Sequence, residues 1–232
     1  MELKLTKVNA YVCPSHSMIG ENVFWGSGYW IDKEECFREG ANILVGSITK
    51  GGWSLTYSLA FPNKYLESST QVVINGKKCS LRKLERLSFY VGDCTSQIFS
   101  QKTAEQLIWN QAKRWSREKV LKLLDELGIN KSEESFCKLP MCSAGKNIWK
   151  YSIALGVLMN KSIFLFPWIS SLMLEEIQED IVRIGKVLKE KEKILLMPVQ
   201  DDNFLQGTDL EYERCRLTRV CGERMQRERI YR

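Results

Sequence analysis

Histidine is almost absent from this chain, and its cysteines are widely dispersed. His16 is the only histidine among 232 residues, and none of the eight cysteines lies in a C-x-x-C pair. Structural zinc sites combine cysteine and histidine at short spacing, so no zinc site is expected. Dispersed cysteines also argue against a secreted disulfide framework and favour a reducing cytosol. The first residues alternate like a strand and do not predict a signal peptide.

No apolar run in the sequence is long enough to cross a membrane. The longest candidate, from Tyr151 to Leu174, is divided by Lys161 into uncharged pieces of 10 and 13 residues. A spanning helix needs roughly 20 apolar residues. These pieces therefore predict a buried helix followed by a buried strand. If the protein acts at a membrane, other subunits must hold it there.

Neither sign of charge dominates, because the chain has 34 lysines and arginines and 28 aspartates and glutamates, which gives a net charge of +6. Part of the excess lies in an arginine-rich tail, which contains Arg214, Arg216, Arg219, Arg224, Arg227, Arg229 and Arg232. Such a tail can favour phosphate or a membrane surface, but a solvated, partly frayed end is the simpler interpretation. Nucleic-acid binding would rest on this tail alone and would depend steeply on salt, and it is not expected.

The pattern of apolar residues predicts an α/β chain. Residues 1–12 read as an edge strand, and Asn75-Gly76 is a strong hairpin turn signal. Residues 100–128 have helical period and end at Gly128. Further strands are expected at 43–45, 71–74, 87–91, 163–166 and 193–197, and helices at 55–60, 81–86, 143–159 and 174–189. This order predicts a core with a parallel sheet, an antiparallel start and a helical arm.

The loop after the strand at 43–45 has the frame of a phosphate-binding loop. The strand leads into Gly46, and Gly51 follows five residues later. In the motif G-x-x-x-x-G-K-[ST], backbone N–H groups at such a helix start hold phosphates. Gly52 stands where the motif has its lysine, and Trp53 stands where it has the hydroxyl that binds magnesium. The loop keeps the frame of the motif and lacks its side chains.

In order and spacing, these segments resemble the nucleotide-binding subunit of ATP-binding-cassette (ABC) transporters over about residues 1–225. The hairpin at 72–77 and the stretch 81–84 match a family segment closely. No single motif is specific, and the similarity lies in five altered motifs that keep the order of the family.

The resemblance implies one ABC-ATPase-like domain over residues 1–232. It would have a P-loop NTPase-like core with a parallel sheet, an antiparallel β subdomain at the front and an inserted helical subdomain. The β subdomain and the phosphate loop would lie in 1–95, the helical subdomain in 96–147, and the rest of the core with the tail in 148–232.

The resemblance also implies that the family's functional side chains are replaced. The glutamine that contacts magnesium in the family becomes Gly92 or Asp93, depending on the alignment. The acidic pair after the apolar strand becomes Pro167-Trp168, and the switch histidine becomes Gln200. The signature motif is reduced to the segment Ser143, Ala144, Gly145, Lys146 and Asn147.

Together these replacements predict no ATP hydrolysis and no catalytic residues. Phosphoryl transfer needs a cation on the phosphates, oxygen ligands for magnesium and a positioned water, and Gly52, Trp53 and Trp168 supply none of these. No metal or cofactor is expected. For ATP two alternatives stay open: the backbone amides of the loop bind it, or tryptophan side chains fill its site. The residues that would contact a retained nucleotide are Tyr11, near the family's adenine-stacking position, and Gly46, Lys50, Gly51, Gly52 and Ser54.

The leading hypothesis is a catalytically degenerate nucleotide-binding subunit of an ABC transporter complex. It would be cytoplasmic, held at the inner face of the cell membrane by its partners. These would be a second, competent ATPase subunit and membrane-spanning subunits. Alternatives are a soluble interaction protein that kept the fold without transport, an ATP-binding subunit with residual activity, and an enzyme whose catalytic groups moved to Glu175, Glu176, Asp201 and Asp202.

Overall fold

The computed structural model describes residues 1–12, 27–31, 34–92, 101–217 and 226–230. Among these residues, the centre is a six-stranded sheet in the order β12-β11-β5-β10-β9-β8. The last five of these strands are parallel to one another, and β12 is antiparallel to β11. The bounds are β5 Gly40–Val45, β8 Ser88–Tyr90, β9 Ile163–Leu165, β10 Ile194–Val199, β11 Tyr212–Arg216 and β12 Gln226–Ile230. The predicted parallel core is confirmed.

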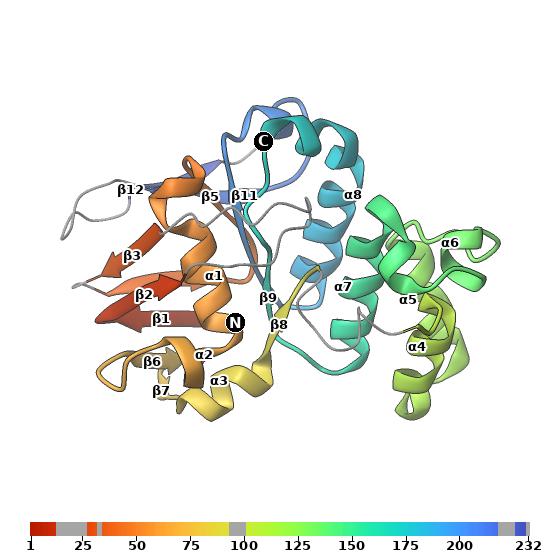
Figure 1. Cartoon of the computed structure of the whole chain (residues 1–232), viewed down its shortest axis with the longest axis horizontal. Coiled ribbons are helices and arrows are strands. Elements are labelled where there is room, and N and C mark those ends of the chain that lie inside the picture. Colours follow the sequence, from red (N-terminus) through yellow and green to blue (C-terminus); the bar gives the residue numbers. More distant parts are fainter. Residues whose placement is uncertain (13–26, 32–33, 93–100, 218–225, 231–232) are drawn as a thin grey trace.

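Helices cover both faces of this sheet, and alternate strand residues belong to two separate hydrophobic cores. Ile43 and Leu195 pack in one core, while Leu44 and Leu196 pack in the other. A parallel sheet covered on both faces needs this near-continuous apolar sequence. Figure 1 shows α1 Gly52–Ala60 on one side of the sheet, and α7 Ile148–Leu158 and α8 Ser171–Glu190 on the other.

A second, antiparallel sheet shares the core around α1. Its order is β4-β1-β6-β7, and β2 and β3 form a separate pair. The bounds are β1 Glu2–Thr6, β2 Val8–Val12, β3 Ser27–Ile31, β4 Glu35–Arg38, β6 Gln71–Ile74 and β7 Lys77–Lys78. The predicted turn at Asn75-Gly76 is confirmed, with φ of +48° and +75° as in a type I′ hairpin.

The prediction of one edge strand over residues 1–12 is wrong. The strand breaks at Lys7, whose φ is +54°, and β1 lies in the middle of its sheet, between β4 and β6. Leu3 and Leu5 are fully buried against the α1 core. The alternation of apolar and polar residues along β1 therefore arises because one face of this central strand packs against the α1 core.

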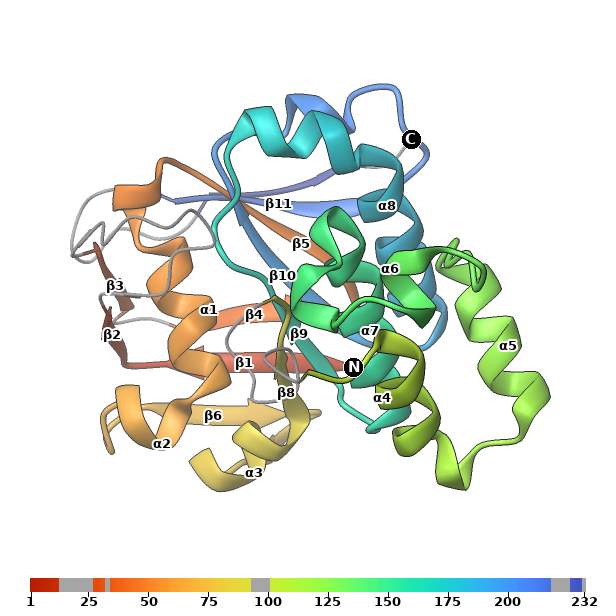
Figure 2. The ribbon, with the colours of Figure 1, turned by 45° about the vertical axis from the view of Figure 1, so that its right-hand side comes forward.

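The helical arm projects to one side of the molecule (Figures 1 and 2). The helical period over 100–128 is confirmed as two helices, because the chain turns at Trp115 and Ser116, and Ser116 caps the second helix. Gly128, with φ of +64°, follows the second helix as predicted. The arm contains α4 Ala104–Gln111, α5 Arg117–Glu126 and α6 Glu134–Cys137, while α2 Pro62–Tyr65 and α3 Leu81–Leu87 precede it. The subdomain boundaries at 95/96 and 147/148 stay a prediction.

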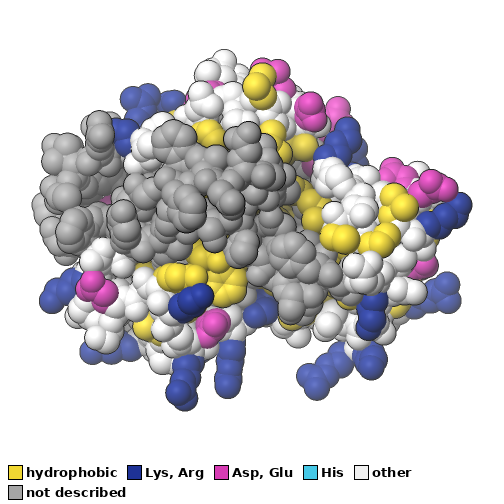
Figure 3. Space-filling model, in the orientation of Figure 1, with side chains coloured by type: hydrophobic (Ala, Val, Ile, Leu, Met, Phe, Trp, Pro, Cys, Tyr) yellow, Lys and Arg dark blue, Asp and Glu magenta, His cyan; other side chains and the backbone are white. Residues whose placement is uncertain are grey.

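The expectation of a solvated tail from Arg214 is wrong for its first residues. Arg214 and Arg216 lie in β11, next to β5 in the central sheet, and Cys215 between them is fully buried. The sequence also predicts a turn at Gly222, a residue that lies outside those the structure describes. Lysine and arginine side chains gather instead along the lower edge of the face in Figure 3, where Figure 1 shows α2 and α3. No helix of the described part is both long and apolar enough to cross a bilayer.

Candidate functional site

The loop from Gly46 to Gly51 joins β5 to α1 at the carboxyl end of the parallel sheet, where α/β folds bind ligands. The Gly46 N–H donates to the Val199 carbonyl at 2.9 Å, so the loop starts beside the end of β10. A 3₁₀ turn over Ile48–Lys50 leads to Gly51, whose φ of +82° lies in the left-handed region that glycine permits. α1 then begins without a side-chain cap.

The space beside Gly52, the position of the motif's lysine, is filled by other side chains. A Cβ atom on Gly52 would lie 2.7 Å from Leu217 Cδ1 and 2.9 Å from Pro198 Cβ. Both distances are too short for a real contact, because interiors are already close-packed. The stem of Lys50 lies over Gly46, with its Cβ 3.2 Å from the point where Gly46 would carry a Cβ.

Trp53, at the position of the magnesium-binding hydroxyl, is tied into aromatic packing between α1 and β8. Its indole N–H donates to Tyr90 Oη at 2.7 Å. The Tyr90 ring stands edge-on to Tyr57, with 5.4 Å between centroids. Thr56 Oγ1 donates to the Phe166 carbonyl at 2.8 Å, which fixes α1 to the end of β9. The first two turns of α1 are therefore held by bonds within the protein.

Trp168, predicted from the sequence to replace an acidic residue of the family, contacts the start of the phosphate-loop frame. Its indole N–H donates to the Gly46 carbonyl at 3.0 Å, so the ring lies at the start of the loop. Trp53 and Trp168 thus have separate hydrogen-bond partners, and no aromatic pair joins them within the described part of the chain. Pro167 lies beside Gly92, 3.9 Å from the point where Gly92 would carry a Cβ. Asp93 lies outside the described residues.

The segment after β10 contains Gln200, which the sequence predicts to replace the family's switch histidine. Gln200 is exposed, and its backbone N–H donates to the Ile169 carbonyl at 3.2 Å. Asp201 Oδ2 accepts from Ser171 Oγ at 2.5 Å, which links this segment to the start of α8. Glu175 and Glu176 are exposed further along the same helix.

Asp202 forms a buried cluster that the sequence did not predict. Arg214 Nη2 lies 2.8 Å from Asp202 Oδ1, and Tyr212 Oη donates to Asp202 Oδ2 at 2.8 Å. The Asp202 side chain is only 7% exposed, so its charge depends on these partners. Asp201 and Asp202 thus both have protein partners that tie the segment after β10 to its neighbours.

The signature-like segment forms two 3₁₀ turns ahead of α7. Asn147 donates to Glu133 Oε2 at 2.9 Å and to Ser135 Oγ at 3.1 Å, which fixes the segment to α6. Ser135 is also hydrogen-bonded to the Tyr151 hydroxyl at 2.8 Å, and burial raises the pKa of Tyr151. Ala144 is buried, whereas three neighbours are exposed to solvent, namely Ser143, Gly145 and Lys146.

Tyr11, the predicted adenine-stacking residue, lies in β2 with its backbone opposite Gly28. Its side chain lies outside what the structure describes. Ser54 is buried in the first turn of α1. The structure therefore brings Gly46, Lys50 and Ser54 together at the loop and the start of α1. It does not place the Tyr11 ring.

Two solved structures resemble this one over nearly its whole length. A protein described as an ABC transporter ATP-binding protein from Pyrococcus furiosus is 13% identical, with a TM-score of 0.59, and the match covers 94% of this chain and 98% of that one. This chain has the fold of an ABC ATPase.

A bacterial Atm1-family ABC exporter with ATP bound has the same identity and TM-score. That match covers 97% of this chain but 38% of the exporter chain. No protein-family model matches this chain, and no curated protein sequence matches it significantly. The predicted fold class, a P-loop core with a parallel sheet and a separate antiparallel sheet, is confirmed.

Proposed function

We propose that this chain is a catalytically degenerate, nucleotide-binding-domain-like subunit of an ABC transporter complex. It pairs with a competent ATPase subunit and couples that subunit to membrane-spanning subunits. The support is the fold, which is shared with an ABC transporter ATP-binding protein and with an exporter that holds ATP. Its role is mechanical and structural, and the partner hydrolyses ATP.

The filled space beside Gly52 is the observation on which the loss of catalysis rests. Leu217 Cδ1 and Pro198 Cβ occupy the volume into which a side chain at residue 52 would extend. No lysine could enter there without moving the end of β10 or the residue after β11. This packing of three segments supports the proposed loss of the motif's cation.

The remaining side chains do not fit a magnesium–ATP complex. Magnesium prefers oxygen ligands in octahedral geometry, and neither Trp53 nor Pro167 has a side-chain oxygen. A carboxylate that positions water is replaced by Trp168, whose indole donates to the Gly46 carbonyl. The site therefore supports no hydrolytic step through these residues.

Phosphate release and ATP binding by the purified chain test this loss directly. We expect no phosphate release with magnesium and ATP above that of a mock preparation from cells without the chain. We also expect no saturable heat of ATP binding by calorimetry. Magnesium-dependent turnover that follows the chain through gel filtration would refute the proposal.

Co-purification from native membranes tests the partners. We expect the tagged chain to recover a different ATPase subunit and a membrane-spanning protein, identified by mass spectrometry. Lys146→Glu, in the exposed part of the signature-like segment, should reduce recovery of the ATPase subunit. Lys119→Glu, exposed on α5, is the matched control and should not. Recovery of the chain without any membrane protein would favour a soluble interaction protein instead.

A further inference from the structure

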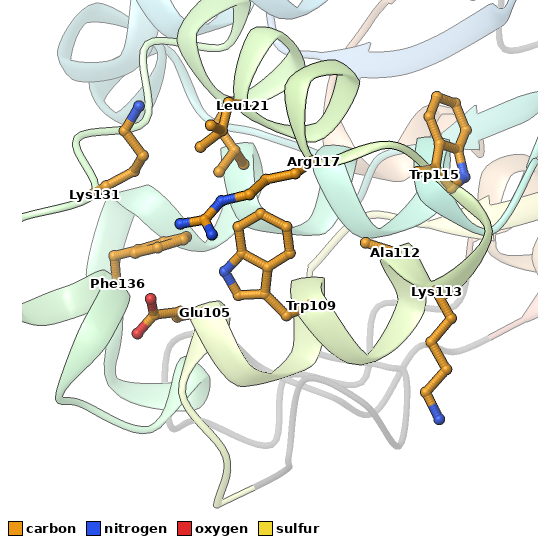
Figure 4. Close-up of a pocket in the computed structure, with 10 residues that line it drawn as sticks. Glu105, Trp109, Ala112, Lys113, Trp115, Arg117, Leu121, Lys131 and Phe136 are labelled. Carbon is orange, nitrogen blue, oxygen red and sulfur yellow. The ribbon is translucent and has the colours of Figure 1, made fainter.

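The helical arm contains a cavity that has no part in the site described above. Its volume is about 580 Å³, and it lies among α4, α5 and α6 (Figure 4). Cavities of roughly 300–1,000 Å³ with an apolar lining and a few polar groups are typical of small-molecule sites. None of its lining residues comes from the phosphate-loop frame or from the segments that contact it.

Aromatic and aliphatic side chains form the body of this cavity. Phe136 and Leu124 are buried, while Trp109, Trp115 and Leu121 remain partly exposed to the cavity. The Trp115 indole N–H donates to the Leu158 carbonyl at 3.1 Å, so this ring is fixed against α7. This part of the apolar wall is therefore held by a hydrogen bond within the protein.

Positive charge exceeds negative charge around the opening. The lining includes three cationic side chains, Lys113, Arg117 and Lys131, and one carboxylate, Glu105. Lys131 is 2.9 Å from Asp125, which offsets its charge. Lys113 and Arg117 form no ion pair with any described carboxylate, and Figure 4 places Lys113 at the end away from Phe136 and Glu105.

Arg117 is the cation best placed to meet a ligand. Its guanidinium lies over the Trp109 ring, 5.9 Å from the centroid, and Figure 4 shows it pointing into the cavity toward Phe136. Arg117 is also the first residue of α5, where the positive end of the helix dipole adds to its charge. Ser116 caps this terminus and Glu118 lies in its first turn, so the guanidinium itself is the group that a bound anion would meet.

We propose that this cavity binds a small amphiphilic anion. The apolar body of the ligand lies against Phe136, Leu121 and the Trp109 ring, and its carboxylate or sulfonate accepts hydrogen bonds from Arg117. The bidentate geometry of guanidinium suits such a group. The inference does not depend on the nucleotide site and would stand if the proposed transporter role failed.

Calorimetric titration with three amphiphiles that have chains of decyl length, each below its micelle concentration or solubility limit, tests the proposal. The probes are decanoate, decanol and decyltrimethylammonium, which differ in head-group charge. We expect saturable binding of decanoate and at least about tenfold weaker binding of the other two, since a charged hydrogen bond changes affinity by that order.

Matched variants assign the binding to this cavity. Arg117→Met keeps the apolar stem and should weaken decanoate binding about tenfold or more, whereas Glu105→Gln should strengthen it. Lys119→Met, on the same helix but outside the cavity, should leave it unchanged. Circular dichroism verifies that each variant is folded. Equal binding of the three probes, or decanoate binding that Arg117→Met does not alter, would overturn the proposal.

Discussion

Gly52→Ala tests whether the position of the missing lysine is closed by packing. The added Cβ would meet Leu217 Cδ1 at 2.7 Å and Pro198 Cβ at 2.9 Å, and overpacking of this kind costs about 1–3 kcal/mol. Alanine is favoured over glycine by about 1 kcal/mol inside a helix, but Gly52 is the first residue of α1 and gains less. We expect a net loss of about 1–2 kcal/mol in the free energy of unfolding.

A double-mutant cycle with Leu217→Ala isolates the contact. Leu217 is 7% exposed, and its truncation alone should cost about 2–3 kcal/mol. In the double variant the smaller side chain makes room for the new Cβ, so the total loss should be at least about 1 kcal/mol less than the sum of the two single losses. Urea unfolding followed by circular dichroism and by tryptophan fluorescence measures all four proteins.

Leu124→Ala, in the helical arm, provides the control for this cycle. Combined with Gly52→Ala, it should give additive losses within about 0.5 kcal/mol, because the two sites share no contact. If Gly52→Ala and Leu217→Ala were also additive within that range, the space beside Gly52 would not be filled by Leu217. The argument that packing excludes a lysine would then fail.

Three further predictions concern contacts around the same loop and the core. Trp168→Phe removes the donor to the Gly46 carbonyl and should lower the free energy of unfolding by about 1 kcal/mol, and unchanged urea unfolding would contradict a stabilising bond. Arg214→Met leaves the buried Asp202 carboxylate without its cation and should cost about 3 kcal/mol, part of which Asp202→Asn in the same chain should restore. Burial lowers the pKa of Lys161, whose Nζ donates to the Arg86 carbonyl at 2.8 Å. The unfolded state then binds this proton more tightly, so stability relative to Lys161→Met should rise as pH increases toward 10.5, and parallel pH profiles would refute this.

Local signals in the sequence were enough to predict the parallel core. Apolar runs such as Ile194–Met197 are too continuous for a strand with one wet face, and they identify strands covered on both sides. Asn75-Gly76 specifies its turn through backbone preferences that act within four residues. Signals of this kind need no knowledge of distant partners.

Central or edge position and the identity of buried partners could not be predicted in this way. The alternation in β1 is the same for an edge or a central strand, and its partner β6 comes much later in the chain. β11 reads as part of a charged tail because Arg214 finds its carboxylate only in the folded chain. The sequence shows that residue 52 is a glycine and not the lysine of the motif, but it does not show that Leu217, which follows β11, lies beside that glycine.

The fold itself uses the loop between β5 and α1. Gly51 is needed for the left-handed turn by which the chain leaves the sheet and enters α1, whether or not a phosphate is bound. The contacts that hold the frame are Trp53 to Tyr90, Thr56 to the Phe166 carbonyl and Trp168 to the Gly46 carbonyl. All of them are internal to the protein. These contacts hold the loop and the start of α1 without a nucleotide, so under the proposed function a substitution that removes ATP chemistry leaves α1 docked between its two sheets.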